Sequence, residues 1–216
     1  MARIKSFAAP HKGLRNVISR FSFTLGHTDW NSNLQLAQLK ELGKEMFTLL
    51  NDHVHTEDEH TLRHLEQRAP GSSDHDKKDH EELEVIQNAL EDQLAAFTGR
   101  ESTEDVHAFY LEFSMFHSRY LEHIYHEETV TELLLQKHFT DEELISHRMQ
   151  IMRSIQFPIL VLWLKYIIPA QSADESLGML AGLKASAPKE AYDHVLTVLK
   201  GEMPADRYEQ LAARLQ

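Results

Sequence analysis

The stretch HVHTEDEH, residues 53–60, concentrates histidines and acidic residues within a segment that otherwise has the pattern of an amphipathic helix. His53 and Glu57 stand four positions apart in it, and His123 and Glu127 repeat that spacing in HIYHEET, residues 123–129. Side chains four residues apart lie one turn apart on the same helix face. Each pair therefore presents an imidazole nitrogen and a carboxylate oxygen together, a combination that suits a divalent metal ion.

Helix-breaking residues and loop motifs predict the helices that must position these pairs. Four segments are bounded by Gly26, by APGSS at 69–73 and by Thr98–Arg100, and we expect helices at about 11–25, 33–67, 74–97 and 102–139. Short loops between consecutive helices favour antiparallel neighbours. The sequence thus predicts an all-α protein built on an up-down-up-down four-helix bundle.

Each of the four segments carries an apolar stripe when read in steps of three and four residues. In segment 102–139 the stripe comprises Val106, Phe109, Phe113, Phe116, Tyr120, His123, Glu127, Val130 and Leu134. In segment 33–67 it comprises Leu39, Leu42, Met46, Leu49 or Leu50, His53, Glu57 and His60. The other two stripes contain His11 and His80, so every predicted inward face includes a histidine.

The free energy of burial decides what these polar groups do. A buried imidazole or carboxylate without a partner costs several kcal/mol, against about 5–15 kcal/mol of stability for a whole domain. At about 1.5 Å per residue, His80 and His123 lie within about 3 Å of the same level of the bundle. We therefore expect a pair of divalent ions at the centre, with Glu57 and Glu127 as the natural bridges between them.

These residues resemble a known family. His11 in HKGLR, His53 and Glu57 in HVHTEDEH, His80 in DHEEL, and His123 and Glu127 in HIYHEET are similar to the ligand motifs of hemerythrin-like (HHE cation-binding) domains. The resemblance covers about residues 8–140. It implies two non-haem iron ions, bridged by carboxylates, that interact with O2, with a related diatomic molecule or with peroxide. The ligand types alone also suit manganese or zinc.

The chain departs from the oxygen-carrying members of that family at two motifs. Those members have HxxxH on the third helix and HxxxxD on the fourth, whereas here His80 is followed by Glu84 and His123 by Glu127. One histidine ligand is lost, and Glu84 could replace it although it lies beside the stripe. The added carboxylate character favours the oxidised metal, which makes reversible oxygen carriage the less favoured function.

Other residues near these motifs also have a simpler structural interpretation. His60 is a candidate ligand or a residue that orients one, and Tyr120 is a core residue or a neighbour of the centre. His55, His64, His75, His117 and His126 lie off the inward stripes and are expected at the surface.

Composition excludes several functional classes. The net charge of -12 and the lack of a basic block argue against nucleic acid and against an anionic membrane surface. The absence of cysteine excludes thiolate metal sites and disulfides. The opening residues MARIKSFAAP are not followed by the apolar run of a secretory signal, and the apolar stretch at 155–170 is short for a bilayer span, so we expect a cytoplasmic protein.

The last third of the chain is predicted to be a separate helical region. We expect a metal-binding domain at 1–139 and a helical extension at 140–216, with capping boxes at Thr140 and Ser172, a helix interrupted at Pro158, and helix starts near Pro188 and Pro204. This extension packs on the bundle, on a second copy or on a partner protein.

The sequence leaves three functions open. The first is binding of O2 or a related small molecule for sensing, storage or redox protection. The second is an oxidase or peroxidase that uses the same di-iron centre. The third is a regulatory or interaction module that the metal only stabilises.

Overall fold

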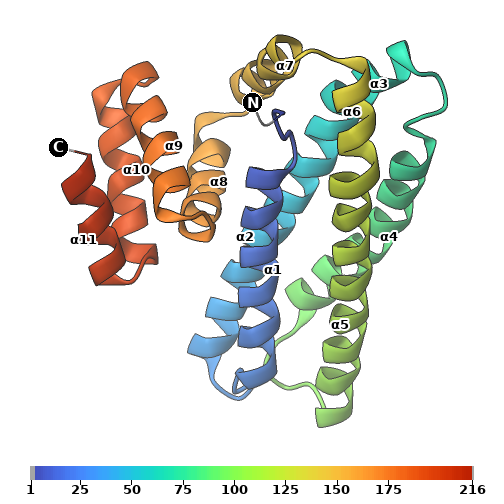
Figure 1. Cartoon of the computed structure of the whole chain (residues 1–216). Helices are drawn as coiled ribbons and strands as arrows, with labels where there is room; N and C mark the ends of the chain where they lie inside the picture. Colours follow the sequence, from blue (N-terminus) through green and yellow to red (C-terminus); the bar gives the residue numbers. More distant parts are fainter. Residues whose placement is uncertain (1–2, 216) are drawn as a thin grey trace. The chain divides into compact units, whose positions relative to one another are not determined.

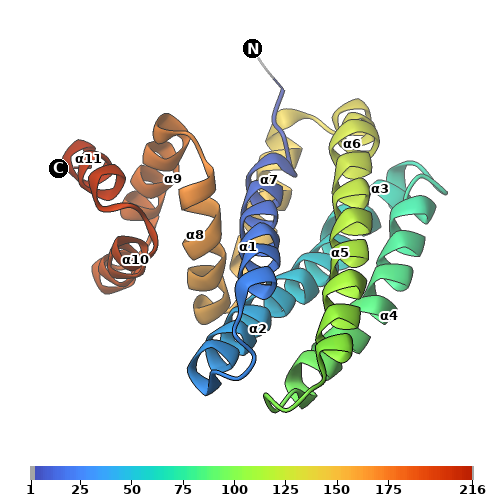
Figure 2. The same cartoon turned by 90° about the horizontal axis from the view of Figure 1, so that it is seen from below.

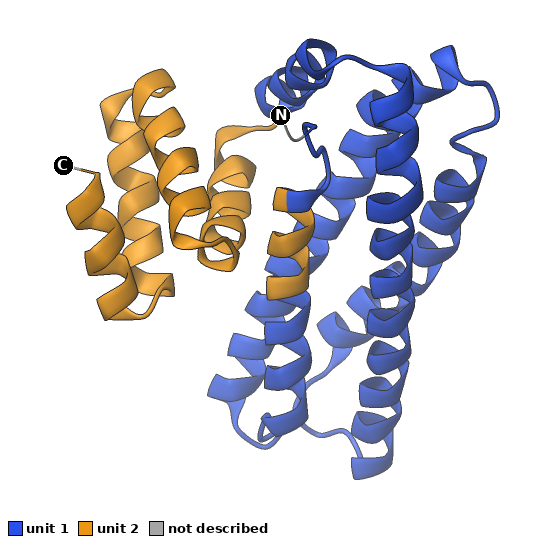
Figure 3. Ribbon diagram, viewed as in Figure 1, with its two compact units in different colours: residues 1–8, 17–154 blue, residues 9–16, 155–216 orange. Residues whose placement is uncertain are grey.

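The computed structural model describes residues 3–215, and every regular element among them is a helix (Figure 1). The chain divides into two compact units, shown in Figure 3: unit 1 comprises Met1–Ala8 and Val17–Ser154, and unit 2 comprises Ala9–Asn16 and Ile155–Gln216. These bounds differ from the predicted domains 1–139 and 140–216, and the helix α1 contributes residues to both units. The all-helical class is confirmed.

The helices of the first 139 residues follow the predicted segments closely. They are α1 (Ala8–His27), α2 (Asn33–Thr56), η1 (Glu57–Leu62), α3 (Arg63–Arg68), α4 (Asp74–Ala96), α5 (Thr103–His126), η2 (Glu127–Thr131) and α6 (Glu132–His138). Ser32 and Ser102 begin α2 and α5, because each hydroxyl accepts a hydrogen bond from the backbone three residues on. Figures 1 and 2 show α2, α4 and α5 lying alongside one another.

The apolar stripes form the core of unit 1. Phe109, Phe113 and Phe116 of α5 are buried, and the ring of Phe113 packs edge-on against Phe21 with centroids 4.6 Å apart. Gly43 of α2 permits the close approach of its neighbours, since a Cβ there would overlap a methyl carbon of Leu94. Gly99 turns the chain between α4 and α5 with φ of +83°, a conformation that favours glycine.

Two π-helical turns change the register of the inward stripes. η1 and η2 each begin at a glutamate of the HxxxE pairs, and each adds one residue to its turn. From the end of η2 onward the inward positions are therefore Thr131 and Leu135, each 1% exposed, while the predicted Val130 is 43% exposed. The prediction that Val130 continues the stripe is wrong for this reason, and Leu134 is only partly buried, at the edge of the core.

A smaller apolar cluster closes one end of unit 1, where α7 (Asp141–Ser154) follows α6. It consists of Phe7, Leu65, Leu135, Phe139 and Leu144. Thr140 and Glu143 form the predicted capping box, and Arg68 pairs with the Glu143 carboxylate. The pairing joins α3 to α7 within the same unit.

Unit 2 has a core of its own. Its helices are α8 (Phe157–Ala170), α9 (Ala173–Ser186), α10 (Lys189–Glu202) and α11 (Ala205–Arg214). Leu164, Ile168, Leu180, Val195 and Leu199 are buried together. Pro158 does not interrupt a helix as expected; it lies in the first turn of α8, where proline is tolerated.

The first half of α1 packs within unit 2. The side-chain amide of Asn16 donates to the backbone carbonyl of Tyr166, and Lys12 pairs with Glu175 at 2.9 Å. Among the residues that the structure describes, none of the helices combines the length and the apolar character that crossing a bilayer requires.

Candidate metal centre

The two HxxxE pairs lie where α2 and α5 pass into their π turns. His53 Nε2 is 3.3 Å from Glu57 Oε2, and His123 Nε2 is 3.4 Å from Glu127 Oε2. All four side chains are buried, with Glu127 fully inaccessible. Both pairs therefore point into the interior of unit 1, as their register in the sequence predicted.

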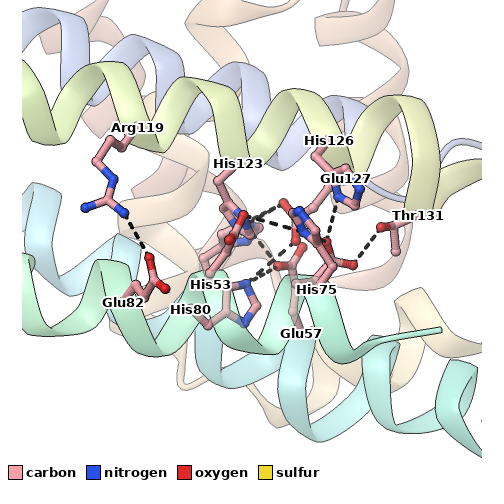
Figure 4. Close-up of polar contacts among 12 residues, drawn as sticks. His53, Glu57, His75, His80, Glu82, Arg119, His123, His126, Glu127 and Thr131 are labelled. Atoms are coloured by element: carbon pink, nitrogen blue, oxygen red, sulfur yellow. Dashed lines mark hydrogen bonds and ion pairs between the residues drawn. The ribbon is translucent and has the colours of Figure 1, made fainter. Parts of the chain in front are cut away.

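His80 of α4 reaches the same point. Its Nε2 lies 3.5 Å from Glu57 Oε2 and 3.7 Å from Glu127 Oε1, contacts that Figure 4 shows between α4 and the ends of the other two helices. Glu57, His80, His123 and Glu127 each offer one ligand atom, and these atoms all lie within 4.8 Å of one another. This group belongs entirely to unit 1.

A second group of donors in unit 1 shares both glutamates with the first. It consists of His53, Glu57 and Glu127, again with ligand atoms within 4.8 Å of one another. His11, the remaining predicted ligand, is fully buried on α1, in the portion of that helix that belongs to unit 2. The five ligand candidates of unit 1 thus form two groups that have the two glutamates in common.

Two other candidates lie outside both groups. Glu84 is exposed on α4, because the inward face of that helix continues from His80 through Leu83 to Gln87. His60 is half-buried in η1, where its Nε2 lies 3.4 Å from the hydroxyl of Ser154. The extra residue in the π turn moves His60 off the line of His53 and Glu57.

The distances within the groups match donors arranged around a common cation. Two ligands that each lie about 2.0–2.2 Å from one ion, at tetrahedral or octahedral angles, are about 3.0–3.5 Å apart. The nitrogen–oxygen separations of 3.3 to 3.5 Å are longer than ordinary hydrogen bonds. His80 Nε2 and His123 Nε2 are buried and make no hydrogen bond among the described residues. A cation between the donors would satisfy these nitrogens.

The electrostatics of the group also favour positive charge. Burial by itself lowers the pKa of His80, but the carboxylates of Asp58, Glu127 and Glu57 outweigh it and raise that pKa from 6.5 to about 12. Burial and then the charges of Glu127 and Glu57 raise the pKa of the Tyr120 hydroxyl well above its ordinary value. Tyr120 therefore stays protonated, a buried donor beside the two carboxylates.

Two acidic residues that sequence analysis did not single out lie beside the histidines. Asp58 Oδ1 lies 3.0 Å from His80 Nδ1, within hydrogen-bond distance, whereas Asp79 Oδ2 lies 3.6 Å from His123 Nδ1, too far for a hydrogen bond. A carboxylate bonded to the far nitrogen of a metal-binding histidine fixes the ring orientation and raises its basicity, and Asp58 is placed to do this for His80. In the sequence Asp58 follows Glu57 and Asp79 precedes His80, and this adjacency to predicted ligands could have indicated both residues.

Comparisons of the chain with protein-family models, with curated proteins and with solved structures give no match. The resemblance to hemerythrin-like domains therefore depends on the sequence motifs that contain the six residues.

Proposed function

We propose that α1, α2, α4 and α5 form an up-down-up-down bundle of the hemerythrin-like kind, which holds two non-haem iron ions and binds O2 or a related small molecule. The observation that carries this proposal is the pair of ligand groups that share Glu57 and Glu127. In this proposal His11 and His53 would hold one ion, His80 and His123 would hold the other, and Glu57 and Glu127 would serve both.

The protein donors are few for two iron ions. Four histidines and two glutamates would hold the pair, fewer donors than two octahedral iron sites need. Glu84 does not add to them, because it is exposed. The iron pair, when bound, would supply Lewis acidity and a redox change. The chain supplies buried surroundings and the Tyr120 hydroxyl, a protonated donor beside the glutamates.

Metal analysis of the purified protein tests this proposal. We expect about two iron ions per chain, falling well below two in His53→Ala and in Glu127→Ala. His117→Ala is the matched control, because His117 is half-buried on α5 and belongs to neither ligand group. Unchanged stoichiometry in both ligand variants, or loss of iron in the control, would contradict the assignment.

The optical spectrum then separates binding from turnover. Bands that appear in air and reverse under argon support binding for sensing or storage. Steady consumption of peroxide with an electron donor supports the oxidase or peroxidase function instead, for which the buried Tyr120 hydroxyl is the favourable feature.

A further inference from the structure

A third cluster of metal-binding side chains lies on the α4–α5 face of unit 1, apart from the two buried groups. His75 and Asp76 come from the first turn of α4, and His126 comes from the end of α5. The ligand atoms of these three residues lie within 4.8 Å of one another. None of the three belongs to the candidate di-iron centre.

The two imidazoles converge on one carboxylate oxygen. His126 Nδ1 lies 2.9 Å and His75 Nδ1 lies 3.8 Å from Asp76 Oδ1. The two rings stack with centroids 3.9 Å apart, so the exposed His75 ring must turn out of the stack for both nitrogens to hold one ion. Figure 4 shows His75 and His126 of this cluster, with His126 near Glu127.

Asp76 is held rigidly. Its side chain is 1% exposed, and its other oxygen accepts a hydrogen bond of 2.6 Å from Thr131, the last residue of η2. A buried carboxylate with one oxygen fixed by the protein and the other facing two imidazoles is the rigid part of a binding site. His75 is exposed and can adjust to an ion.

The cluster opens into a surface hollow. The hollow has a volume of about 420 Å³, and its lining includes His75, Asp79, His123 and His126. Water in this space can complete the coordination of an ion that the protein holds with three ligands.

We propose that His75, Asp76 and His126 bind a third divalent ion, of the zinc or iron(II) class, at the mouth of this hollow. Two imidazoles and one carboxylate select such an ion over magnesium or calcium, which prefer oxygen ligands alone. The ion takes the place of the proton between His126 and Asp76.

Equilibrium dialysis of the full chain against Zn²⁺, followed by metal analysis, tests the proposal. We expect His75→Ala to bind one ion fewer per chain than the wild type, or to weaken that ion by at least about tenfold. The matched control is His107→Ala, an exposed histidine of α5 outside all three groups, which keeps the wild-type number. His126→Ala is the second variant, and it is expected to lose the same ion.

The result is independent of the di-iron centre. His53→Ala weakens the buried ions but leaves the ion bound by His75. If His75→Ala and His126→Ala both retain the wild-type number, the third site does not exist. If they each lose one ion while His53→Ala loses none, the third site stands and the proposed di-iron function fails.

Discussion

His80 shows how the buried carboxylates of unit 1 demand positive charge. Its pKa of about 12 means that, without metal, the ring remains an imidazolium between Asp58, Glu57 and Glu127. The proton then balances charge that a metal ion balances otherwise. Metal and proton compete for the same ring, so metal binding must release this proton.

The competition predicts proton release at a pH where an ordinary histidine has none to give. At pH 8, Zn²⁺ binding by the metal-free chain should release a proton from His80, and the affinity should rise by about tenfold per pH unit. Calorimetric titration in two buffers of different ionisation enthalpy measures the release. Asp58→Asn removes the carboxylate that contributes most to the raised pKa of His80, so this variant should release less proton on binding Zn²⁺. Equal proton release in the variant and the wild type would contradict the assignment.

The stability of the metal-free chain follows the same pKa. The folded pKa of His80 lies above its ordinary 6.5, so its stabilising contribution is complete below that pH and is lost as pH rises toward 12. Metal reverses this trend, because binding needs the neutral ring.

At the scale of elements, the π turns η1 and η2 are the features that a helix pattern cannot anticipate. Each begins at a glutamate that both ligand groups share, and π turns recur at functional sites because they re-aim side chains within a helix. The residue inserted in η2 shifts the inward face of the following turns to Thr131 and Leu135. We infer that η2 serves the position of Glu127 rather than the packing of α6.

Deleting Val130 tests that role of η2. The deletion shortens the π turn to an ordinary turn and leaves Thr131 and Leu135 on the inward face, since they move to the third and seventh positions after Glu127. We expect the thermal midpoint of the metal-free chain to be unchanged or higher, while bound metal per chain falls. The control Val130→Ala keeps the π turn and alters only an exposed side chain. Full metal content after the deletion would show that η2 is not needed for the centre.

The difference between local signals and tertiary contacts explains which features the sequence could predict. Helix limits were predictable, because caps such as Ser32 and Ser102 and the turn at Gly99 are local signals. His53, Glu57, His123 and Glu127 were predictable because one helical period relates each pair. Asp76 was not, since its partners His126 and Thr131 lie on another helix and meet it only through the tertiary register.

At the scale of the whole molecule, α1 is the element that both compact units share. Its Ala9–Asn16 portion belongs to unit 2 and its Val17–His27 portion to unit 1. A helix is cooperative along its length, so neither unit can lose its part of α1 without weakening the other. We therefore expect the two units to unfold in one transition.

The two tryptophans allow this expectation to be measured, because Trp30 belongs to unit 1 and Trp163 to unit 2. Trp163→Phe leaves a fluorescent reporter in unit 1, and Trp30→Phe leaves one in unit 2. Both single-tryptophan proteins should show the same urea midpoint. Clearly separated midpoints would mean that α1 does not couple the units.

Gly13 of α1 provides the perturbation that completes the test. An added Cβ there would lie 2.7 Å from Ile167 Cγ1 and 3.3 Å from the Ile167 backbone, so Gly13→Ala should lower the free energy of unfolding by about 1 kcal/mol, as overpacking outweighs the gain in helix propensity. Gly178→Ala in α9 is the matched control, because nothing lies within 4 Å of its new methyl group, and it should stabilise the chain by up to about 1 kcal/mol. If α1 couples the units, Gly13→Ala lowers the midpoint reported by Trp30 as much as the midpoint reported by Trp163. A shift confined to Trp163 would show instead that the defect stays within unit 2.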